Sequence, residues 1–498
     1  MLPLISRAHQ FTDRTAIIDP QGSYTYGQLL ADSAAIARNL LEENSSLKEA
    51  RVAFMIRPGY DYVKTQWAIW RAGGIAVPIG ISYPEPSIRY LLEDSQVSII
   101  IAADEFRSLL GPIAAEMDIP MLHQEGNATA DTPLPDVSEE DRAMILYTSG
   151  TTGKPKGVVS THASIKAQIT ALTEAWEWQQ SDHILNILPL HHVHGIINVL
   201  SCALWSGACC QFLSSFDAKA VFAEFQKGRI NLFMAVPTIY YKLISYWEKL
   251  PEAEQAAISS RLKQFRLMVS GSAALPVSTL EKWRSISGHT LLERYGMTEM
   301  GMAISNPYQG ERRPGHIGQP LPGVKVRLMD EAGNQVADGQ PGEIQVKGAN
   351  VFREYWNKPE ATAGSFTEDG WFMTGDIAQL EDGYYRILGR NSVDIIKSGG
   401  YKISALEIEE VLRKHPAISD CGVVGIPDEE WGEIVGAGLV LGDGSLDYDE
   451  LKDWLKQSLP GYKIPRKYLL LDDLPRNAMG KVTKKELTRM FTSNSDQA

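Results

Sequence analysis

The sequence predicts an α/β protein with parallel sheets covered by helices, followed by a region of antiparallel β structure. Short apolar runs alternate with helical patterns through the first four hundred residues, which is typical of strand–helix–strand units. After Gly315, polar and apolar residues alternate between glycine-rich turns, which favours antiparallel strands. Of the 498 residues, 44% are hydrophobic and 22% are charged, so the chain can bury a large core.

The individual elements follow from these patterns in chain order. Apolar runs predict buried strands over 51–56, 75–79 and 97–102, and apolar residues at helical spacing predict helices over 61–72 and 87–94. The same alternation returns with strands over 143–146, 184–188, 232–236 and 265–269. The antiparallel region contains predicted strands over 324–328, 343–347 and 384–388. A charged, turn-like segment near 389–392 then separates this region from a last unit of ordinary domain size.

Charge and cysteine content exclude several classes of protein. Lys and Arg number 48 and Asp and Glu 61, so the net charge is −13, whereas binders of nucleic acid or anionic membranes are basic. The four cysteines form no CxxC pair and suit a reducing compartment. The N-terminus lacks the order of a signal peptide, and histidines interrupt the most apolar stretch, 187–205. We therefore expect a cytoplasmic protein without nucleic-acid or integral membrane association.

The strongest local motif is the loop at 147–158, which follows a strand-like run. It contains three glycines, four hydroxyl residues and two lysines, a composition that suits phosphate binding through backbone N–H groups, hydroxyls and charge. It is not a Walker A loop, because the spacing differs and Pro155 stands where the Mg²⁺-binding hydroxyl would be. The alternative is a flexible surface loop.

Four further motifs are weak when each is taken alone. Tyr-Gly-Met-Thr-Glu at 295–299 offers an aromatic face for a purine and a carboxylate for Mg²⁺. Thr-Gly-Asp at 374–376 offers a carboxylate for ribose hydroxyls, and the segment 389–402 combines cations with paired glycines. The stretch 461–490 has eight Lys or Arg and three Asp or Glu, including a Gly-Lys at 480–481. That stretch is either a basic arm for anionic substrates or a solvated helix face.

Together these five motifs resemble, in type and in order, those of the adenylate-forming enzymes, which include acyl-CoA synthetases. The resemblance covers nearly the whole chain and implies a large N-terminal domain of two sheet-plus-helix lobes and a small β-barrel. It implies a smaller, mobile α+β C-terminal domain, with domains at 1–389 and 393–498 and a hinge at 390–392. The implied activity is that of an AMP-forming carboxylate–CoA ligase: a carboxylate attacks ATP to form an acyl-adenylate, and CoA then displaces AMP.

The resemblance also implies a role for each motif residue. ATP or AMP would contact Thr148, Ser149, Gly150, Thr151, Thr152, Lys156, Tyr295, Gly296, Asp376 and Arg390. The catalytic set would be Lys481, Thr298, Glu299 and His192, with Glu299 holding Mg²⁺. A lysine suits the first half-reaction because its transition state needs positioned positive charge.

Domain movement would turn about Ser392, although many family members have Asp or Lys there. The segment Ser398, Gly399, Gly400 and Tyr401 would then line the tunnel for CoA, where missing side chains admit a thin arm. A plain turn is the alternative for these glycines. We expect a monomer or a homodimer.

Two features narrow the acid that is activated. His191, His192 and His194 fall where the family borders its acyl pocket, and Arg294 precedes Tyr-Gly, where most members have a neutral or small polar residue. A buried arginine is costly unless it is paired, and a second substrate carboxylate would pair with it. These residues resemble the malonyl-CoA synthetase branch.

We therefore predict malonate or methylmalonate as the acid, bound by His192, His194, Ser272 and Arg294. The alternative for Arg294 is a protein partner such as Glu293, and the alternative for each histidine is ordinary packing. Rival activities are a medium- or long-chain fatty acyl-CoA synthetase and an enzyme that loads a carrier protein. A non-catalytic scaffold would be expected to lack Glu299 or Lys481, and a dehydrogenase would need a Gly-x-Gly-x-x-Gly after a strand.

Overall fold

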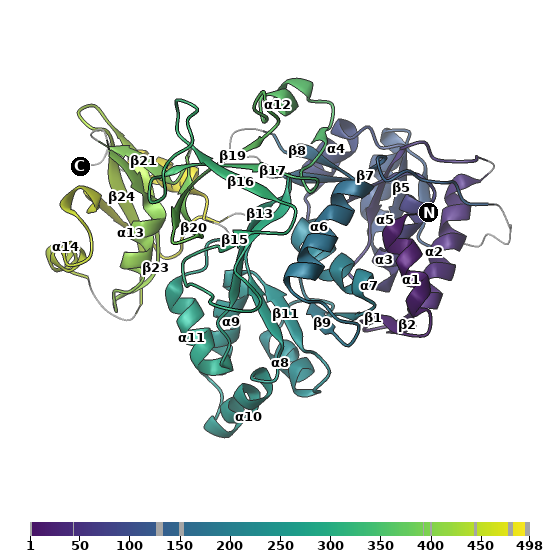
Figure 1. The fold of residues 1–498 in the computed structure, drawn as a ribbon, viewed down its shortest axis with the longest axis horizontal. Coiled ribbons are helices and arrows are strands. Elements are labelled where there is room, and N and C mark those ends of the chain that lie inside the picture. The colour runs from purple at the N-terminus through teal and green to yellow at the C-terminus, as the bar shows by residue number, and fades with distance from the viewer. Residues whose placement is uncertain are drawn as a thin grey trace.

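The computed structural model describes residues 2–42, 44–125, 133–148, 154–391, 393–398, 401–442, 446–476 and 482–493. Within these ranges the strands form four sheets, and Figure 1 shows two sheet-and-helix lobes, a β-rich region beside them and a separate unit at the C-terminal end. The predicted strands of the α/β region are all present, with ends that shift by a few residues.

The first sheet carries the strand that leads into the phosphate loop. Its order is β18 (Glu354–Tyr355), β8 (Lys156–Thr161), β7 (Arg142–Thr148), β4 (Ile75–Pro78), β3 (Arg51–Met55), β5 (Ile99–Ala102) and β6 (Met121–His123). From β7 to β6 the pairs are parallel, whereas β8 and β18 add antiparallel edges. Its helices are α3 (Tyr60–Arg71), α4 (Glu85–Asp94) and α5 (Asp104–Glu116).

The second sheet supplies the residues before and within the Tyr-Gly motif. Its order is β15 (Gln319–Pro320), β14 (Gly301–Ser305), β13 (Leu292–Met297), β12 (Leu267–Ser270), β11 (Leu232–Ala235), β9 (His183–Asn186), β10 (Cys209–Phe212), β1 (Thr15–Asp19) and β2 (Gly22–Thr25). Strands from β13 to β1 are parallel, and antiparallel strands lie at both ends.

Helices of the N-terminal region join the two lobes. Helix α6 (His162–Ala175) contacts β8 of the first sheet and β14 of the second, and it lies between the lobes in Figure 1. Thr161 and Ser164 form a capping box at its start, which satisfies backbone N–H groups of the first turn. The remaining helices of this region are α1 (Pro3–Ala8), α2 (Tyr26–Leu41), α7 (Cys202–Ser206), α8 (Ala218–Gln226), α9 (Pro237–Trp247), α10 (Glu252–Leu262) and α11 (Val277–Ser287).

The apolar stretch 187–205 contains a feature that hydrophobic patterning did not predict. His194–Ser201 forms a fully buried π-helix that runs directly into α7. In the described part of the chain, no helix is long and apolar enough to cross a membrane.

The third sheet is antiparallel, as the alternating pattern predicts. Its order is β16 (Lys325–Met329), β17 (Gly342–Lys347), β19 (Phe372–Glu381) and β20 (Tyr384–Arg390), and the short α12 (Pro359–Ala363) lies before β19. This sheet occupies the region that the family resemblance assigns to a small barrel. One continuous core joins it to the first two sheets.

The fourth sheet belongs to the C-terminal unit and has its own cores. Its strands are β22 (Tyr401–Ser404), β21 (Ile395–Ser398), β24 (Gly432–Leu441), β23 (Ile418–Asp428) and β25 (Lys467–Leu470), with α13 (Ala405–Leu412), α14 (Tyr448–Lys456) and α15 (Lys484–Ser493) beside them. Arg390, the first residue of the predicted hinge, ends β20 of the third sheet, and β21 of the fourth sheet begins at Ile395.

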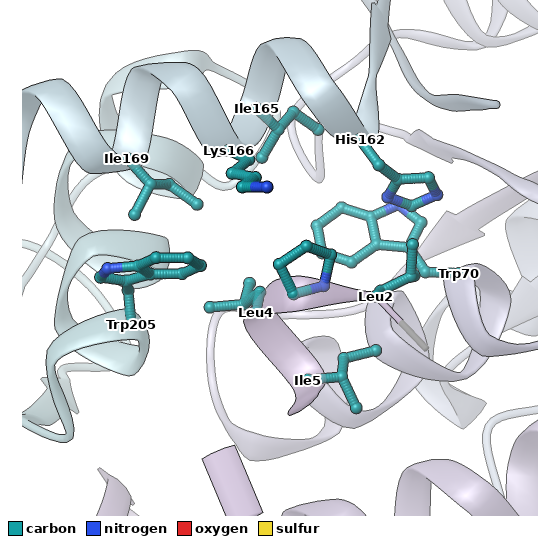
Figure 2. Close-up of a pocket in the computed structure, with 10 residues that line it drawn as sticks. Leu2, Leu4, Ile5, Trp70, His162, Ile165, Lys166, Ile169 and Trp205 are labelled. Atoms are coloured by element: carbon teal, nitrogen blue, oxygen red, sulfur yellow. The ribbon is translucent and has the colours of Figure 1, made fainter. Parts of the chain in front are cut away.

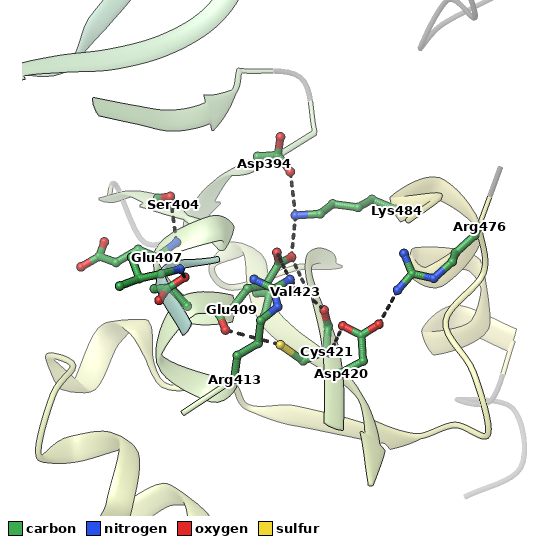
Figure 3. Close-up of polar contacts among 12 residues, drawn as sticks. Asp394, Ser404, Glu407, Glu409, Arg413, Asp420, Cys421, Val423, Arg476 and Lys484 are labelled. Atoms are coloured by element: carbon green, nitrogen blue, oxygen red, sulfur yellow. Dashed lines mark hydrogen bonds and ion pairs between the residues drawn. The ribbon is translucent and has the colours of Figure 1, made fainter. Parts of the chain in front are cut away.

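A buried ionic cluster ties the start of this unit to its last helix. The Lys484 ammonium lies 2.6 Å from Asp394 and 2.8 Å from Glu409, and Glu409 also accepts a hydrogen bond from the Val423 N–H (Figure 3). Asp394 in turn accepts a 3.0 Å hydrogen bond from the Arg390 N–H. The lysine is held by two carboxylates inside the unit, so it is not on a solvated helix face.

Candidate active site

The base of the phosphate loop is defined by two paired strands. Thr148 at the end of β7 is opposite Lys156 at the start of β8, and the Thr148 hydroxyl lies 3.5 Å from the Lys156 carbonyl oxygen. Ser149, Gly150, Thr151 and Thr152 lie outside the described residues. The Lys156 ammonium lies 4.5 Å from the centre of the Tyr355 ring, a cation–π contact that holds it at the loop base.

Tyr355 also contacts Glu299, so it links this carboxylate to Lys156. The Tyr355 hydroxyl donates a 2.9 Å hydrogen bond to the Glu299 carboxylate, which is buried. Burial raises the pKa of Glu299, although Lys156 and Arg390 act in the opposite direction. Thr298, directly before it, is half-buried. Of the predicted phosphate and metal residues, the structure thus brings Lys156 and Glu299 together through Tyr355.

Tyr295, Asp376 and Arg390 come from three motifs and form one hydrogen-bonded group. The Tyr295 hydroxyl donates to one Asp376 oxygen, and Arg390 Nε donates to the other at 3.0 Å. Asp376 and Arg390 are opposite each other in the β19–β20 pair, and burial raises the pKa of Tyr295. At Gly296 an added Cβ would overlap the Gly301 carbonyl oxygen, so this position admits no side chain.

Arg294, Ser272 and His194 form a second, buried polar group. Arg294 Nη2 donates to the Ser272 hydroxyl at 3.3 Å, and that hydroxyl lies 3.2 Å from His194 Nδ1. Arg294 is 3% exposed, and burial lowers its pKa to about 9. Burial first, and then the neighbouring Arg294, lower the pKa of His194.

This polar group retains binding capacity. Among the described residues, Arg294 Nε and Nη1 and His194 Nε2 are buried without a hydrogen-bond partner. Among the described residues Arg294 also forms no ion pair with Glu293, which accepts a 3.3 Å hydrogen bond from the Gly315 N–H. Unpaired buried donors are costly, so the arrangement suits an anionic ligand. His192 is half-buried beside His191, with ring centres 4.2 Å apart.

The C-terminal unit contributes less described structure to the site. Ser398 is buried and pairs with Tyr401, whose ring is 53% exposed and stacks on Tyr462 at 4.4 Å. Gly399, Gly400, the hinge residue Ser392 and the lysine Lys481 lie outside the described residues. Their predicted roles stay predictions.

Two residues at the site were missed by sequence reasoning. Tyr355 lies outside every motif; the pairing of β18 with β8 and a hydrogen bond from the Phe352 N–H to the Glu299 carbonyl oxygen bring it beside Lys156 and Glu299. Gly271 lies between Ser270 and Ser272, where an added Cβ would overlap the Arg294 guanidinium. Gly271 could have been found from its place next to Ser272, a candidate ligand residue. No feature of the neighbouring sequence marked Tyr355.

A separate cavity lies away from these groups. It is lined mainly by apolar side chains of α1, α3, α6 and α7, including Leu4, Trp70, Ile169 and Trp205 (Figure 2). None of the predicted site residues that the structure describes lines it, so it is not the predicted acyl pocket.

Comparisons with known proteins give a consistent result. A family model described as AMP-binding enzyme matches residues 4–356, and one for the C-terminal domain of these enzymes matches residues 407–481. The mitochondrial malonate–CoA ligase of Mus musculus is 45% identical over 98% of this chain and 91% of its own length. The malonate–CoA ligase of Arabidopsis thaliana is 40% identical over 97% and 87%.

Solved structures and a more distant relative extend the comparison. ATP-bound MatB from Rhodopseudomonas palustris superposes with a TM-score of 0.89 at 32% identity, covering 99% of both chains. A malonyl-CoA ligase with methylmalonyl-CoA and AMP bound has a TM-score of 0.70 at 35% identity, covering 96% of this chain and all of its own. A long-chain-fatty-acid–CoA ligase of Bacillus subtilis is 33% identical over 99% of this chain and 94% of its own length.

Proposed function

Because the chain belongs to the AMP-binding enzyme family, we propose that it activates malonate with ATP and transfers the malonyl group to CoA. One carboxylate of malonate attacks the α-phosphorus of ATP, pyrophosphate leaves, and malonyl-adenylate forms. The thiolate of CoA then attacks the malonyl carbonyl carbon, and AMP leaves as the thioester forms. Methylmalonate, which adds a single methyl group, is the second candidate acid.

The observation that best supports malonate as the substrate is the buried Arg294 with its unpaired hydrogen-bond donors. A monocarboxylate with an alkyl chain would leave the guanidinium facing hydrocarbon, at the cost of an unpaired buried charge. The distal carboxylate of malonate can accept from the guanidinium in a bidentate manner and from His194 or Ser272. This favours malonate over the medium- and long-chain acids that the Bacillus subtilis relative suggests.

Other residues of the chain bind and orient the nucleotide. Asp376, held by Tyr295 and Arg390, would accept the ribose hydroxyls, and Thr298 would donate to the α-phosphate. Glu299 fits Mg²⁺, because magnesium usually takes one or two carboxylates together with phosphate oxygens; the ion would neutralise charge on the triphosphate. Lys156 at the loop base and Lys481 would add positive charge to the phosphates.

A panel of acids tests the proposal directly. Purified protein with ATP and CoA is expected to release pyrophosphate with malonate, less with methylmalonate, and little with acetate or octanoate. Strong turnover of octanoate with none of malonate would overturn the proposal. Measuring malonyl-CoA in the same reactions separates a CoA ligase from an enzyme that loads a carrier protein, since the latter would form the adenylate and little thioester.

Arg294 provides the matched variant. Arg294→Ala is expected to raise the malonate KM by about tenfold or more, since a charge-assisted hydrogen bond contributes about 1.5–3 kcal/mol. The KM for ATP should not change. Arg284→Ala, which removes an exposed arginine on α11, is the control. An unchanged malonate KM in Arg294→Ala would assign the guanidinium a purely structural role.

Compartment and assembly stay predictions. The sequence favours a cytoplasmic protein, whereas the mouse relative is mitochondrial. Fractionation of the source cells decides the compartment, and sedimentation of the purified chain decides between a monomer and a homodimer.

A further inference from the structure

Asp94 occupies an unfavourable position unless other groups stabilise it. It is the last residue of α4, where the helix dipole disfavours a carboxylate, and its side chain is only 15% exposed. The Lys358 ammonium lies 2.6 Å from Oδ1, and the Tyr147 hydroxyl donates to Oδ2 at 2.9 Å. A cation and a phenol from distant parts of the chain therefore hold this carboxylate in place.

A second tyrosine lies against the same carboxylate. The Tyr90 hydroxyl lies 3.2 Å from Asp94 Oδ1 and 2.7 Å from the Pro155 carbonyl oxygen. A phenol has one proton, so the shorter contact is the donated bond, and Lys358 supplies the hydrogen bond to Oδ1. The rings of Tyr90 and Tyr147 meet edge to face at 6.1 Å.

These contacts fall on the two ends of the phosphate loop. Tyr147 is the residue before Thr148, and Pro155 is the residue before Lys156. The Tyr147 ring also packs against Gly157, where an added Cβ would stand 3.2 Å from its Cζ. Lys358 follows closely after Tyr355, which contacts Lys156 and Glu299. The group thus joins α4, both loop ends and the segment after β18.

We propose that Asp94, Tyr90, Tyr147 and Lys358 form a clamp that fixes the two described ends of the phosphate loop, at Tyr147 and at Pro155, and thereby supports binding of the triphosphate of ATP. We assign them as positioning residues, because their hydrogen bonds and ion pair join them to one another and to the Pro155 carbonyl oxygen at the end of the loop. The inference rests on the proposed function only in taking ATP as the substrate. Because the described clamp contacts do not include Tyr295, Asp376 or Arg390, changes to the clamp should leave the predicted ribose group unaffected.

Binding of two nucleotides tests the clamp. Tyr90→Phe keeps the ring and removes the hydrogen bond to the Pro155 carbonyl. Affinity for a non-hydrolysable ATP analogue, measured by calorimetry, is expected to fall about fivefold, the equivalent of one hydrogen bond of about 1 kcal/mol. Affinity for AMP should be unchanged. Tyr147→Phe should have the same selective effect from the other end of the loop.

The control is Tyr241→Phe, which alters an exposed tyrosine on α9 and should change neither affinity. Equal affinities of wild type and Tyr90→Phe for the ATP analogue would overturn the clamp, as would parallel losses for the ATP analogue and AMP. Neither measurement contains an acid. The nucleotide affinities can therefore contradict the clamp while malonate turnover is normal. Equally, malonate turnover can be absent while the nucleotide affinities support the clamp.

Discussion

At the scale of single residues, Gly271 controls where the Arg294 guanidinium can lie. A Cβ at this position would overlap the guanidinium carbon and nitrogens, and the backbone of Gly271 is not in the left-handed region. The atoms that must move are the end of a flexible side chain, so substitution should displace the arginine rather than unfold the sheet.

Gly271→Ala is therefore expected to weaken malonate binding with little loss of stability. Steady-state kinetics should show a malonate KM raised by about tenfold, as for loss of a charge-assisted hydrogen bond, with the ATP KM retained. Gly461→Ala, at a position with open space around it, is the control. A malonate KM equal to that of the wild type would show that the guanidinium tolerates the shift.

For single residues, the sequence predicts which residue types lie at the site better than it predicts which side chains contact one another. Tyr295, Asp376 and Arg390 stand in three separate motifs, and the structure joins them because strands β13, β19 and β20 converge. The alternative pairing of Arg294 with Glu293 was open from the sequence alone. The structure does not show this pairing among the described residues; there the Glu293 carboxylate accepts the Gly315 N–H.

At the scale of elements, hydrophobic patterning predicts most buried strands of the α/β region. It does not predict the π-helix at His194–Ser201, since π- and α-helices differ in hydrogen-bond register while both can be buried on all sides. Nor does it predict β18, a two-residue strand whose existence depends on pairing with β8 some 200 residues earlier, as the register of Tyr355 with Val158 shows.

Neighbouring lysines in the basic stretch near the C-terminus have different surroundings in the folded helix. Lys484 and Lys485 are neighbours on α15, yet the first is buried between Asp394 and Glu409 and the second is exposed (Figure 3). Removing Lys484 leaves Asp394 without its cation, while Glu409 keeps Arg413 at 3.2 Å. Breaking a buried ion pair in this way costs about 3–5 kcal/mol.

Lys484→Met should therefore destabilise the C-terminal unit strongly, whereas Lys485→Met should change its stability by less than about 0.5 kcal/mol. Urea unfolding followed by the fluorescence of the tryptophans, with limited proteolysis to locate the opened unit, measures both. Equal stabilities of the two variants would mean that the cluster carries no net stabilisation.

At the scale of the whole molecule, the length alone suggests about three domains, whereas one core unites the first three sheets. Helix α13 of the C-terminal unit contacts that body at β20 and at the start of α11. Glu410 of α13 accepts a 3.4 Å hydrogen bond from the Val277 N–H at the start of α11. Glu410 also raises the pKa of Glu293, although burial is the main cause and brings that pKa to about 8.

Glu293 makes the stability of the molecule depend on pH. Between its ordinary pKa of 4.5 and about 8, the unfolded chain has released the proton that the folded chain keeps. Rising pH therefore favours the unfolded state, and stability falls through this window. In Glu293→Gln, the free energy of unfolding should not fall through this window. The stability of the variant relative to the wild type should therefore be greater above about pH 8 than near pH 5.

Chemical denaturation across this pH range measures the effect. Glu252→Gln, on the exposed start of α10, should leave the pH dependence as it is in the wild type. Parallel curves for the wild type and Glu293→Gln would exclude Glu293 as the titrating group.

The late strand β18 also has a consequence for synthesis on the ribosome. In the first sheet, β8 gains its edge partner β18 only when residues 354–355 have been made. In the second sheet, β1 gains its parallel partner only when β10 has been made. The fourth sheet draws its described strands from 395–470 alone. On a nascent chain the two N-terminal sheets can therefore reach their full strand order only after distant parts of the chain have emerged, whereas the C-terminal unit can close its sheet within its own stretch of chain.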